Sequence, residues 1–249
     1  LRTAVAELQI HAGWAGFEAG DYGRVMYHYS RGLDLATGVQ DAYCQAVALN
    51  WAGLATIEHG HPNDGLKMLQ CAQVKAGEIP RDISRSTVVI GEGSRTAVQA
   101  CGRADSATAL AALGQPEAAY RELATSRELW EATTADRGGD LNRPAAILEM
   151  ARGRLDAAEH LAAASVRRWA GGSRVGHTNS SVVLATIHVR AGERDGLGLA
   201  HDAITKVGKL SSIRARRRLH PLAEALDTWP GADARDLART ARQVATARV

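Results

Sequence analysis

Five short stretches that begin with glycine decide the fold: Gly20-Asp21-Tyr22, Gly60-His61-Pro62, Gly114-Gln115-Pro116, Gly153-Arg154-Leu155 and Gly192-Glu193-Arg194. Each stretch follows an apolar helical segment and precedes an amphipathic one. A glycine at the end of a helix can adopt the left-handed conformation that terminates it, and Asp, Pro or Glu just after it suits the first turn of another helix. Each stretch is therefore predicted to be the corner between two helices.

The corner glycines recur at intervals of 40, 54, 39 and 39 residues. A tetratricopeptide repeat, in which two helices form a hairpin that stacks on the next hairpin, is slightly shorter, at about 34 residues. The second interval is about 15 residues longer than the others, and Pro80, Gly91 and Gly93 break the helical pattern there. We therefore predict an insertion at about residues 79–94.

Small residues recur at fixed offsets from the corners, as closely crossing helices require. Seven positions before the corner glycines stand Gly13, Gly53, Ala107, Ala146 and Ala185, and five positions after them stand Val25, Gly65, Ala119, Ala158 and Leu197. These columns predict an all-α fold, a right-handed superhelical solenoid of about five tetratricopeptide-like helix pairs with capping helices at the C-terminus.

The solenoid is expected to cover residues 1–210, and residues 211–249 are expected to be a helical cap within the same domain. The cap would cover the apolar surface that the last repeat leaves open. Its predicted apolar stripe consists of Leu219, Leu222, Leu226 and Leu237.

Composition favours a soluble helical protein of the cytoplasm. The net charge of +3 over 249 residues indicates neither a nucleic-acid coat nor an acidic tail. The three cysteines form no C-x-x-C pair, which fits reduced thiols, and neither a signal peptide nor an apolar run near about 18 residues is present. Leu1 reads as part of a helix already under way, so we expect the chain to be a fragment of something longer.

Several segments resemble a known family. His11-Ala12-Gly13-Trp14, Gly20-Asp21-Tyr22 and Leu33-Asp34-Leu35-Ala36 are similar to the C-terminal tetratricopeptide-like region of actinobacterial helix-turn-helix regulators of the xenobiotic-response-element class. Two further segments also resemble segments of that family: Ser165-Val166-Arg167-Arg168-Trp169 and Arg214-Ala215-Arg216-Arg217-Arg218-Leu219. The resemblance implies a homodimeric sensor domain that reaches DNA only through a helix-turn-helix domain, which residues 1–249 do not contain.

In tetratricopeptide proteins the ligand lies against the first helix of each pair. Residues ten, six and three positions before the corner glycine are expected to point inward. The candidate groove residues are Ile10, Trp14, Phe17, Asn50, Leu54, Ile57, Arg143 and Ile147. Amide and guanidinium groups such as those of Asn50 and Arg143 can hold a peptide backbone or a carboxylate. The alternative is that Asn50 packs locally and that Arg143 is solvated.

Aromatic residues concentrate in the first fifty-odd residues and favour an apolar or peptide ligand between the first two repeats. The alternative places Trp14 and Tyr29 at ordinary core positions. His59 and His61 flank a corner glycine without further ligands at metal-site spacing, so we expect turn residues and no metal or cofactor. His188 and His201 are expected in the core or in hydrogen bonds between helices.

The sequence contains no G-x-S-x-G elbow, no H-E-x-x-H and no phosphate loop, so the chain is not expected to be an enzyme. The leading hypothesis is a ligand-sensing and oligomerisation domain of a transcriptional regulator, with a peptide or small metabolite in the concave groove. The alternative is a free-standing protein–protein interaction scaffold without a DNA role. A groove-borne enzyme using Glu18 and Glu58 is a remote third reading.

Overall fold

The computed structural model describes residues 1–81, 84–87, 91–132 and 140–247. Within these ranges the regular elements are helices, apart from one antiparallel sheet of two strands. Five helix pairs follow one another along the chain: α1 (Arg2–Glu18) and α2 (Tyr22–Thr37), α3 (Ala42–Glu58) and α4 (Pro62–Glu78), α5 (Arg95–Ala112) and α6 (Pro116–Glu131), α7 (Asn142–Ala151) and α8 (Leu155–Trp169), and α9 (Arg174–Ala191) and α10 (Gly196–Gly208). The remaining helices are α11 (Ile213–Arg217), α12 (His220–Asp227) and α13 (Ala232–Thr246).

All five predicted corners are confirmed. Their glycines have φ angles between +71° and +96°, in the left-handed region where a side chain is unfavourable. The residue after each glycine donates its backbone N–H to the carbonyl five residues earlier, as in Asp21 to Gly16 (3.0 Å) and Glu193 to His188 (3.1 Å). This is the 6→1 bond of the Schellman motif, which satisfies a carbonyl that the ending helix leaves unpaired.

Capping residues mark the helix starts. Asp21, Asp41, Ser94 and Ser173 each accept a hydrogen bond from a backbone N–H in the first turn of α2, α3, α5 and α9. The helices α4 and α6 begin with a proline. Proline is tolerated in the first turn of a helix because a backbone N–H would have no intrahelical partner there. Local signals therefore mark the starts of these six helices.

The two columns of small residues lie where helices meet. Ala107, Ala146, Ala185, Ala119 and Ala158 are all at most 2% exposed. Gly13, Gly53, Gly65 and Val25 are buried as well, and Leu197 is half-buried. The predicted close packing of each helix pair is therefore confirmed.

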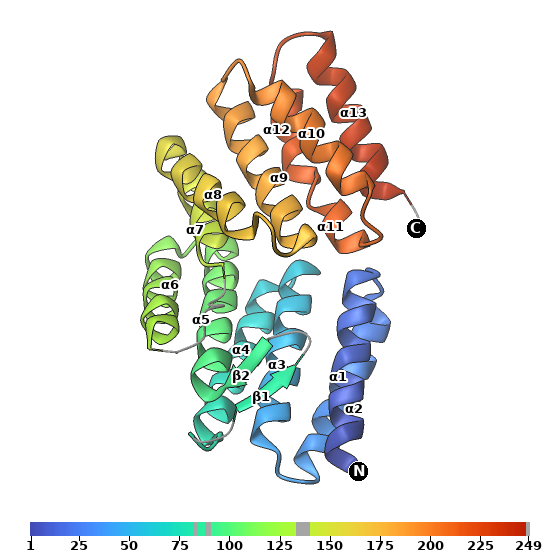
Figure 1. The fold of residues 1–249 in the computed structure, drawn as a ribbon, viewed down its shortest axis with the longest axis vertical. Coiled ribbons are helices and arrows are strands. Elements are labelled where there is room, and N and C mark those ends of the chain that lie inside the picture. Colours follow the sequence, from blue (N-terminus) through green and yellow to red (C-terminus); the bar gives the residue numbers. More distant parts are fainter. Residues whose placement is uncertain (82–83, 88–90, 133–139, 248–249) are drawn as a thin grey trace. The chain divides into compact units, whose positions relative to one another are not determined.

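The chain forms two compact units. The first contains residues 1–17 and 21–141, and the second contains residues 18–20 and 142–249. In the first unit each helix packs on the next from α2 to α6, and α3 also contacts α5 (Figure 1, blue to green). Its main core gathers Ile10, Phe17, Tyr29, Trp51 and Leu54 with their neighbours.

The predicted insertion lies between α4 and α5. Its described part contains the strands β1 (Ser84–Thr87) and β2 (Gly91–Ser94), which pair antiparallel with Ser84 opposite Ser94 and Thr87 opposite Gly91. Residues 82–83 and 88–90 lie outside the described residues.

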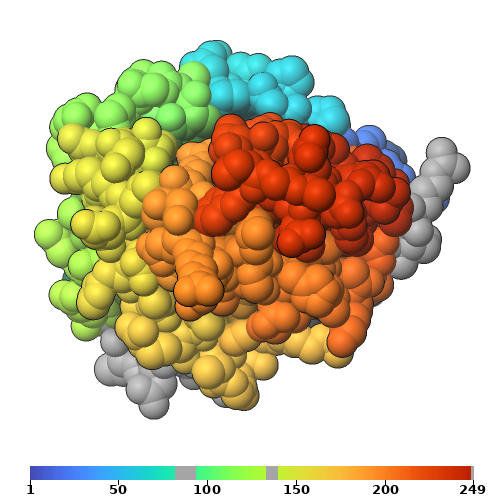
Figure 2. All heavy atoms as spheres, turned by 90° about the horizontal axis from the view of Figure 1, so that it is seen from above, coloured from blue at the N-terminus to red at the C-terminus, as the bar shows by residue number. Residues whose placement is uncertain are grey.

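In the second unit α9 packs against α7, α8, α10 and α12. Its larger core joins α9 and α10 to the C-terminal helices, and the buried residues of α13 are Ala234, Ala238, Ala241 and Ala245. Leu219, Leu222 and Leu226 are fully buried in that core, and Leu237 packs against it, as the predicted stripe requires. In the space-filling view α13, in red, lies on the surface beside α10 and α12 (Figure 2). The division into a repeat region over 1–210 and a cap over 211–249 stays a prediction.

No described helix combines the length and apolar character needed to cross a lipid bilayer.

Candidate functional site

Two tryptophans join the first helices of the first two pairs. The ring of Trp14, on α1, meets the ring of Trp51, on α3, edge to face, with ring centroids 4.6 Å apart. Phe17 approaches Trp14 in the same manner, at 5.7 Å. Trp51 and Phe17 are buried, at 8% and 7% exposure, whereas Trp14 is only partly buried. This edge-to-face geometry is favoured by the ring quadrupoles.

An amide–carboxylate contact joins α3 to α5. Asn50 donates from Nδ2 to Asp105 Oδ2, at 2.9 Å, and is itself 1% exposed. Its Oδ1 atom is buried and has no hydrogen-bond partner among the described residues. We call Trp14, Trp51, Asn50 and Asp105 the first-helix row, because together they connect the first helices of three successive pairs.

Gly102 makes room for this row. A Cβ atom at position 102 would lie 2.7 Å from Asn50 Oδ1 and 2.0 Å from Gln73 Nε2. The Gln73 amide in turn donates to the carbonyl of Gln99, at 3.2 Å. A side chain at position 102 would displace both amides. Glycine at this position therefore allows α5 to pack closely against α3 and α4.

The three cysteines lie in different environments and are therefore expected to differ in reactivity. Cys71 is exposed, Cys44 is buried and Cys101 is half-buried, and desolvation of the Cys101 thiol together with the negative charge of Asp105 raises its pKa to about 12. The thiolate is the reactive form, so Cys101 stays protonated and inert at neutral pH. With iodoacetamide at pH 7.5 and peptide mapping of the folded protein, we expect Cys71 to be alkylated first. Alkylation of Cys101 as fast as that of Cys71 would contradict this environment.

The predicted groove residues fall into three places. Ile10, Phe17, Asn50 and Leu54 are buried in or beside the main core of the first unit, together with the partly buried Trp14. Ile57 packs in a separate cluster with Leu69 and Ala109. Arg143 and Ile147 lie on α7 in the second unit, where Arg143 is half-buried and Ile147 is 43% exposed. Their role in ligand binding stays a prediction.

The corner of the second pair carries an aromatic stack. The His59 ring lies parallel to the Tyr22 ring, at 3.9 Å and 2° between planes. Tyr22 Oη and Thr56 Oγ1 are 3.3 Å apart. His59 and His61 flank the ends of α3 and α4, so the expectation of turn residues is confirmed.

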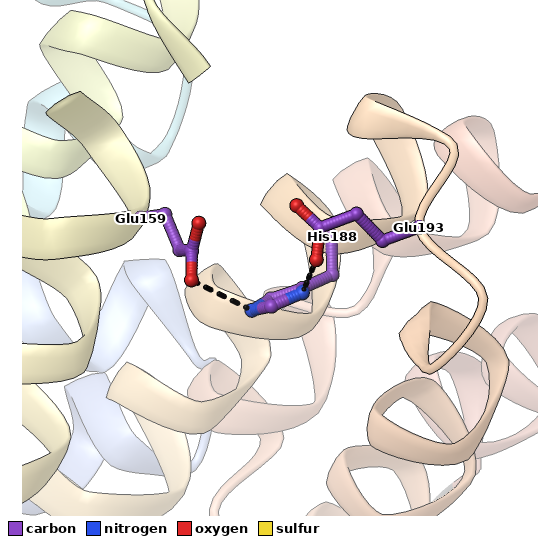
Figure 3. Close-up of side chains that lie close together, drawn as sticks. All are labelled: Glu159, His188 and Glu193. Atoms are coloured by element: carbon purple, nitrogen blue, oxygen red, sulfur yellow. Dashed lines mark hydrogen bonds and ion pairs between the residues drawn. The ribbon is translucent and has the colours of Figure 1, made fainter. Parts of the chain in front are cut away.

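A histidine–carboxylate cluster lies in the second unit. His188, near the end of α9, contacts Glu193 through Nδ1, and its Nε2 atom faces Glu159 Oε1 of α8 at 3.7 Å (Figure 3). Its side chain is 14% exposed, and each carboxylate side chain is 42% exposed. Among the described residues these three could hold a metal ion. The expectation of a core position or a hydrogen bond between helices holds only in part for His188, whose hydrogen bond is to Glu193 just beyond the end of its own helix. The same expectation for His201 is wrong, because its side chain is 69% exposed beside Asp202.

The preceding corner carries a related pair. Glu149 stands four residues before Gly153, as His188 stands four before Gly192, and Arg154 follows Gly153 as Glu193 follows Gly192. Arg154 Nε lies 2.6 Å from Glu149 Oε2 in an ion pair, and Arg154 Nη2 donates a hydrogen bond to Glu149 Oε1 at 3.0 Å. Side chains at these two positions therefore meet across the corner because the 6→1 bond holds their backbones together. The Gly192 corner differs from the Gly153 corner in that a third side chain, Glu159 of α8, lies beside His188.

Comparison with known proteins supports the fold. No protein-family model matches the sequence, and no curated protein matches it. Two structures of nearly identical TPR-like repeats from a putative kinesin light chain of Podosopora anserina, one of them a single-substitution variant of the other, have TM-scores of 0.52 and 0.51. Both are 15% identical to this chain, and the match covers 84% of this chain and 96% or 97% of theirs.

A third structure, the TPR2AB-domain:pHSP90-complex of yeast Sti1, has a TM-score of 0.43 at 15% identity over 97% of both chains. At the TM-scores of the first two structures the likeness is one of fold. The helix pairs of this chain therefore have the architecture of tetratricopeptide-like repeat solenoids.

Proposed function

We propose that this chain is a protein-interaction module that binds an extended segment of a partner protein on the first-helix row of the first unit. The observation that carries the proposal is the Trp14–Trp51 pair, in which a partly exposed indole rests on a buried one. Aromatic side chains with one face packed and another accessible are typical anchors for a partner's apolar side chain.

The architecture supports the same reading. Stacked helix pairs expose extended surfaces formed by equivalent helices, and repeat proteins use such surfaces for binding. Asn50 and Asp105 lie on the neighbouring part of the row and are already hydrogen-bonded to each other. We therefore assign the anchoring role to Trp14 and a supporting role to the Asn50–Asp105 pair, which keeps α3 and α5 in register.

The test is a selection of linear peptides displayed on phage against the immobilised full chain, followed by affinity measurement by fluorescence polarisation. We expect Trp14→Ala to weaken the selected peptides by about 30-fold, the loss of one anchor worth about 2 kcal/mol. Tyr27→Ala is the matched control, because Tyr27 is a 65% exposed aromatic on the second helix of the same pair. Circular dichroism checks that both variants fold, and Trp14→Phe is expected to bind more tightly than Trp14→Ala. Equal affinity for wild type and Trp14→Ala would overturn the proposal.

The narrower hypothesis of a regulator's sensor domain rests on the family resemblance of segments such as His11-Ala12-Gly13-Trp14. It requires a homodimer whose thermal stability rises with a peptide or small metabolite. Analytical ultracentrifugation and a thermal-shift screen distinguish it from the interaction module. A monomer that responds to protein segments but to no metabolite favours the module.

A further inference from the structure

His188 lies between two carboxylates, one at each ring nitrogen (Figure 3). The two carboxylates come from different places in the repeat: Glu159 belongs to α8, and Glu193 follows the corner glycine of the α9–α10 pair. The backbone N–H of Glu193 donates to the carbonyl of His188, at 3.1 Å. Glu193 is therefore held beside Nδ1 by the corner itself, whereas Glu159 reaches Nε2 from the neighbouring helix.

The Nε2 side of the ring has no hydrogen bond to Glu159. The separation of 3.7 Å between Nε2 and Glu159 Oε1 exceeds the about 2.7–2.9 Å of a charge-assisted N–H···O bond. With Nδ1–H donated to Glu193, neutral imidazole has its lone pair on Nε2, and that lone pair faces the carboxylate oxygen. Two electron-pair donors that face each other are suited to a cation between them.

We propose that His188 Nε2 and the Glu159 carboxylate bind a divalent transition-metal ion of the zinc class, with Glu193 orienting the imidazole. Zinc lies about 2.0–2.1 Å from a ring nitrogen and about 2.0–2.2 Å from a carboxylate oxygen, so two such bonds span up to about 4.3 Å. The observed 3.7 Å falls within that span. A carboxylate on the second ring nitrogen is the usual partner of a metal-bound histidine, because it fixes the tautomer and increases the basicity of the ligating nitrogen.

The ligand types and their exposure select the ion. An imidazole suits zinc and its transition-metal neighbours, whereas calcium and magnesium prefer sites made of oxygen atoms. Each carboxylate side chain is 42% exposed, so water has access to complete the coordination of the ion. Binding would tie α8 to α9 and so link two successive helix pairs within the second unit.

Two pairs elsewhere in the chain serve as internal comparisons. Glu149 and Arg154 occupy the equivalent corner positions and satisfy each other with opposite charges, so this corner geometry needs no ion by itself. His201 Nδ1 and Asp202 Oδ1 are also 3.7 Å apart, but both side chains are 69% exposed. The pair at His201 therefore controls for a histidine and a carboxylate that are merely neighbours on the surface.

The test is isothermal titration of the chelator-treated full chain with ZnCl₂ at constant pH. We expect wild type and His201→Gln to bind one more zinc ion than His188→Gln and Glu159→Gln. Glu193→Gln should keep the site with an affinity about 10–100-fold lower, as removal of an orienting partner does. Calcium in place of zinc should give no such difference between the variants.

Circular dichroism checks that each variant folds. Because Glu159→Gln changes a half-exposed side chain, it remains an informative variant if His188→Gln unfolds. Equal zinc stoichiometry and affinity in wild type, His188→Gln and Glu159→Gln would overturn the proposal.

Discussion

The substitution Gly65→Ala, in helix α4, is expected to destabilise the protein by about 1–3 kcal/mol. Alanine normally favours a helix over glycine by about 1 kcal/mol. At position 65, however, a Cβ atom would lie 2.6 Å from the carbonyl oxygen of Gly53 and 2.5 Å from Ile57 Cγ1. The carbonyl belongs to the backbone of α3 and cannot move without displacing the helix, so α3 and α4 must separate.

Gly77→Ala is the matched control on the same helix. Among the described residues, no atom outside the immediate helix backbone lies within 4 Å of a Cβ atom at position 77. This variant should gain stability by about 0.5–1 kcal/mol, because the helix propensity acts without a clash. Urea unfolding followed by circular dichroism measures both. If the two variants shift the unfolding midpoint in the same direction, the close approach of α3 and α4 is wrong.

Arg216→Ala is expected to cost the second unit about 1.5–3 kcal/mol, the usual range for hydrogen bonds that involve a charged group. Its guanidinium donates to the carbonyl of Leu210 at 3.0 and 3.1 Å, and to those of Gly208 and Ala247 at 3.4 Å each. These carbonyls follow or end α10 and α13, where no intrahelical donor remains. One side chain therefore completes the ends of two helices.

The planar guanidinium is required for this arrangement, so Arg216→Lys should recover less than half of the loss. Arg217→Ala is the control, because its side chain is exposed on the same short helix and should change the unfolding free energy by less than about 0.5 kcal/mol. Thermal unfolding of the full chain gives both values. Equal midpoints for Arg216→Ala and Arg217→Ala would show that the carbonyl contacts of Arg216 add nothing to the stability of the second unit.

The features that depend on local chemistry were predictable from the sequence. A corner glycine acts within a few residues of itself, and the columns of small residues follow from the helix crossing in each pair. The corners at Gly20, Gly60, Gly114, Gly153 and Gly192 were therefore found without the structure, as was the apolar stripe around Leu222.

The features that depend on contacts between pairs were harder to predict. Asp105 stands nine residues before the corner glycine Gly114, whereas groove residues were expected ten, six or three residues before a corner. The partner of Asn50 was therefore not predicted. The spacing of His188 and Glu193 across a corner was visible, but Glu159 joins them from another pair, and no spacing rule relates it to them. The pairing of Ser84 with Ser94 was not predicted either, because the sequence showed only that Pro80, Gly91 and Gly93 interrupt the helical pattern.

Hydrogen–deuterium exchange tests most directly whether the first helices form the binding surface. The full chain is compared with and without a peptide that passed selection on wild type and lost affinity for Trp14→Ala. We predict slower exchange in α1 and α3, where Trp14 and Trp51 meet, and unchanged exchange in α2 and α4. Slower exchange confined to α2 and α4, or to the second unit, would contradict a binding site on the first-helix row.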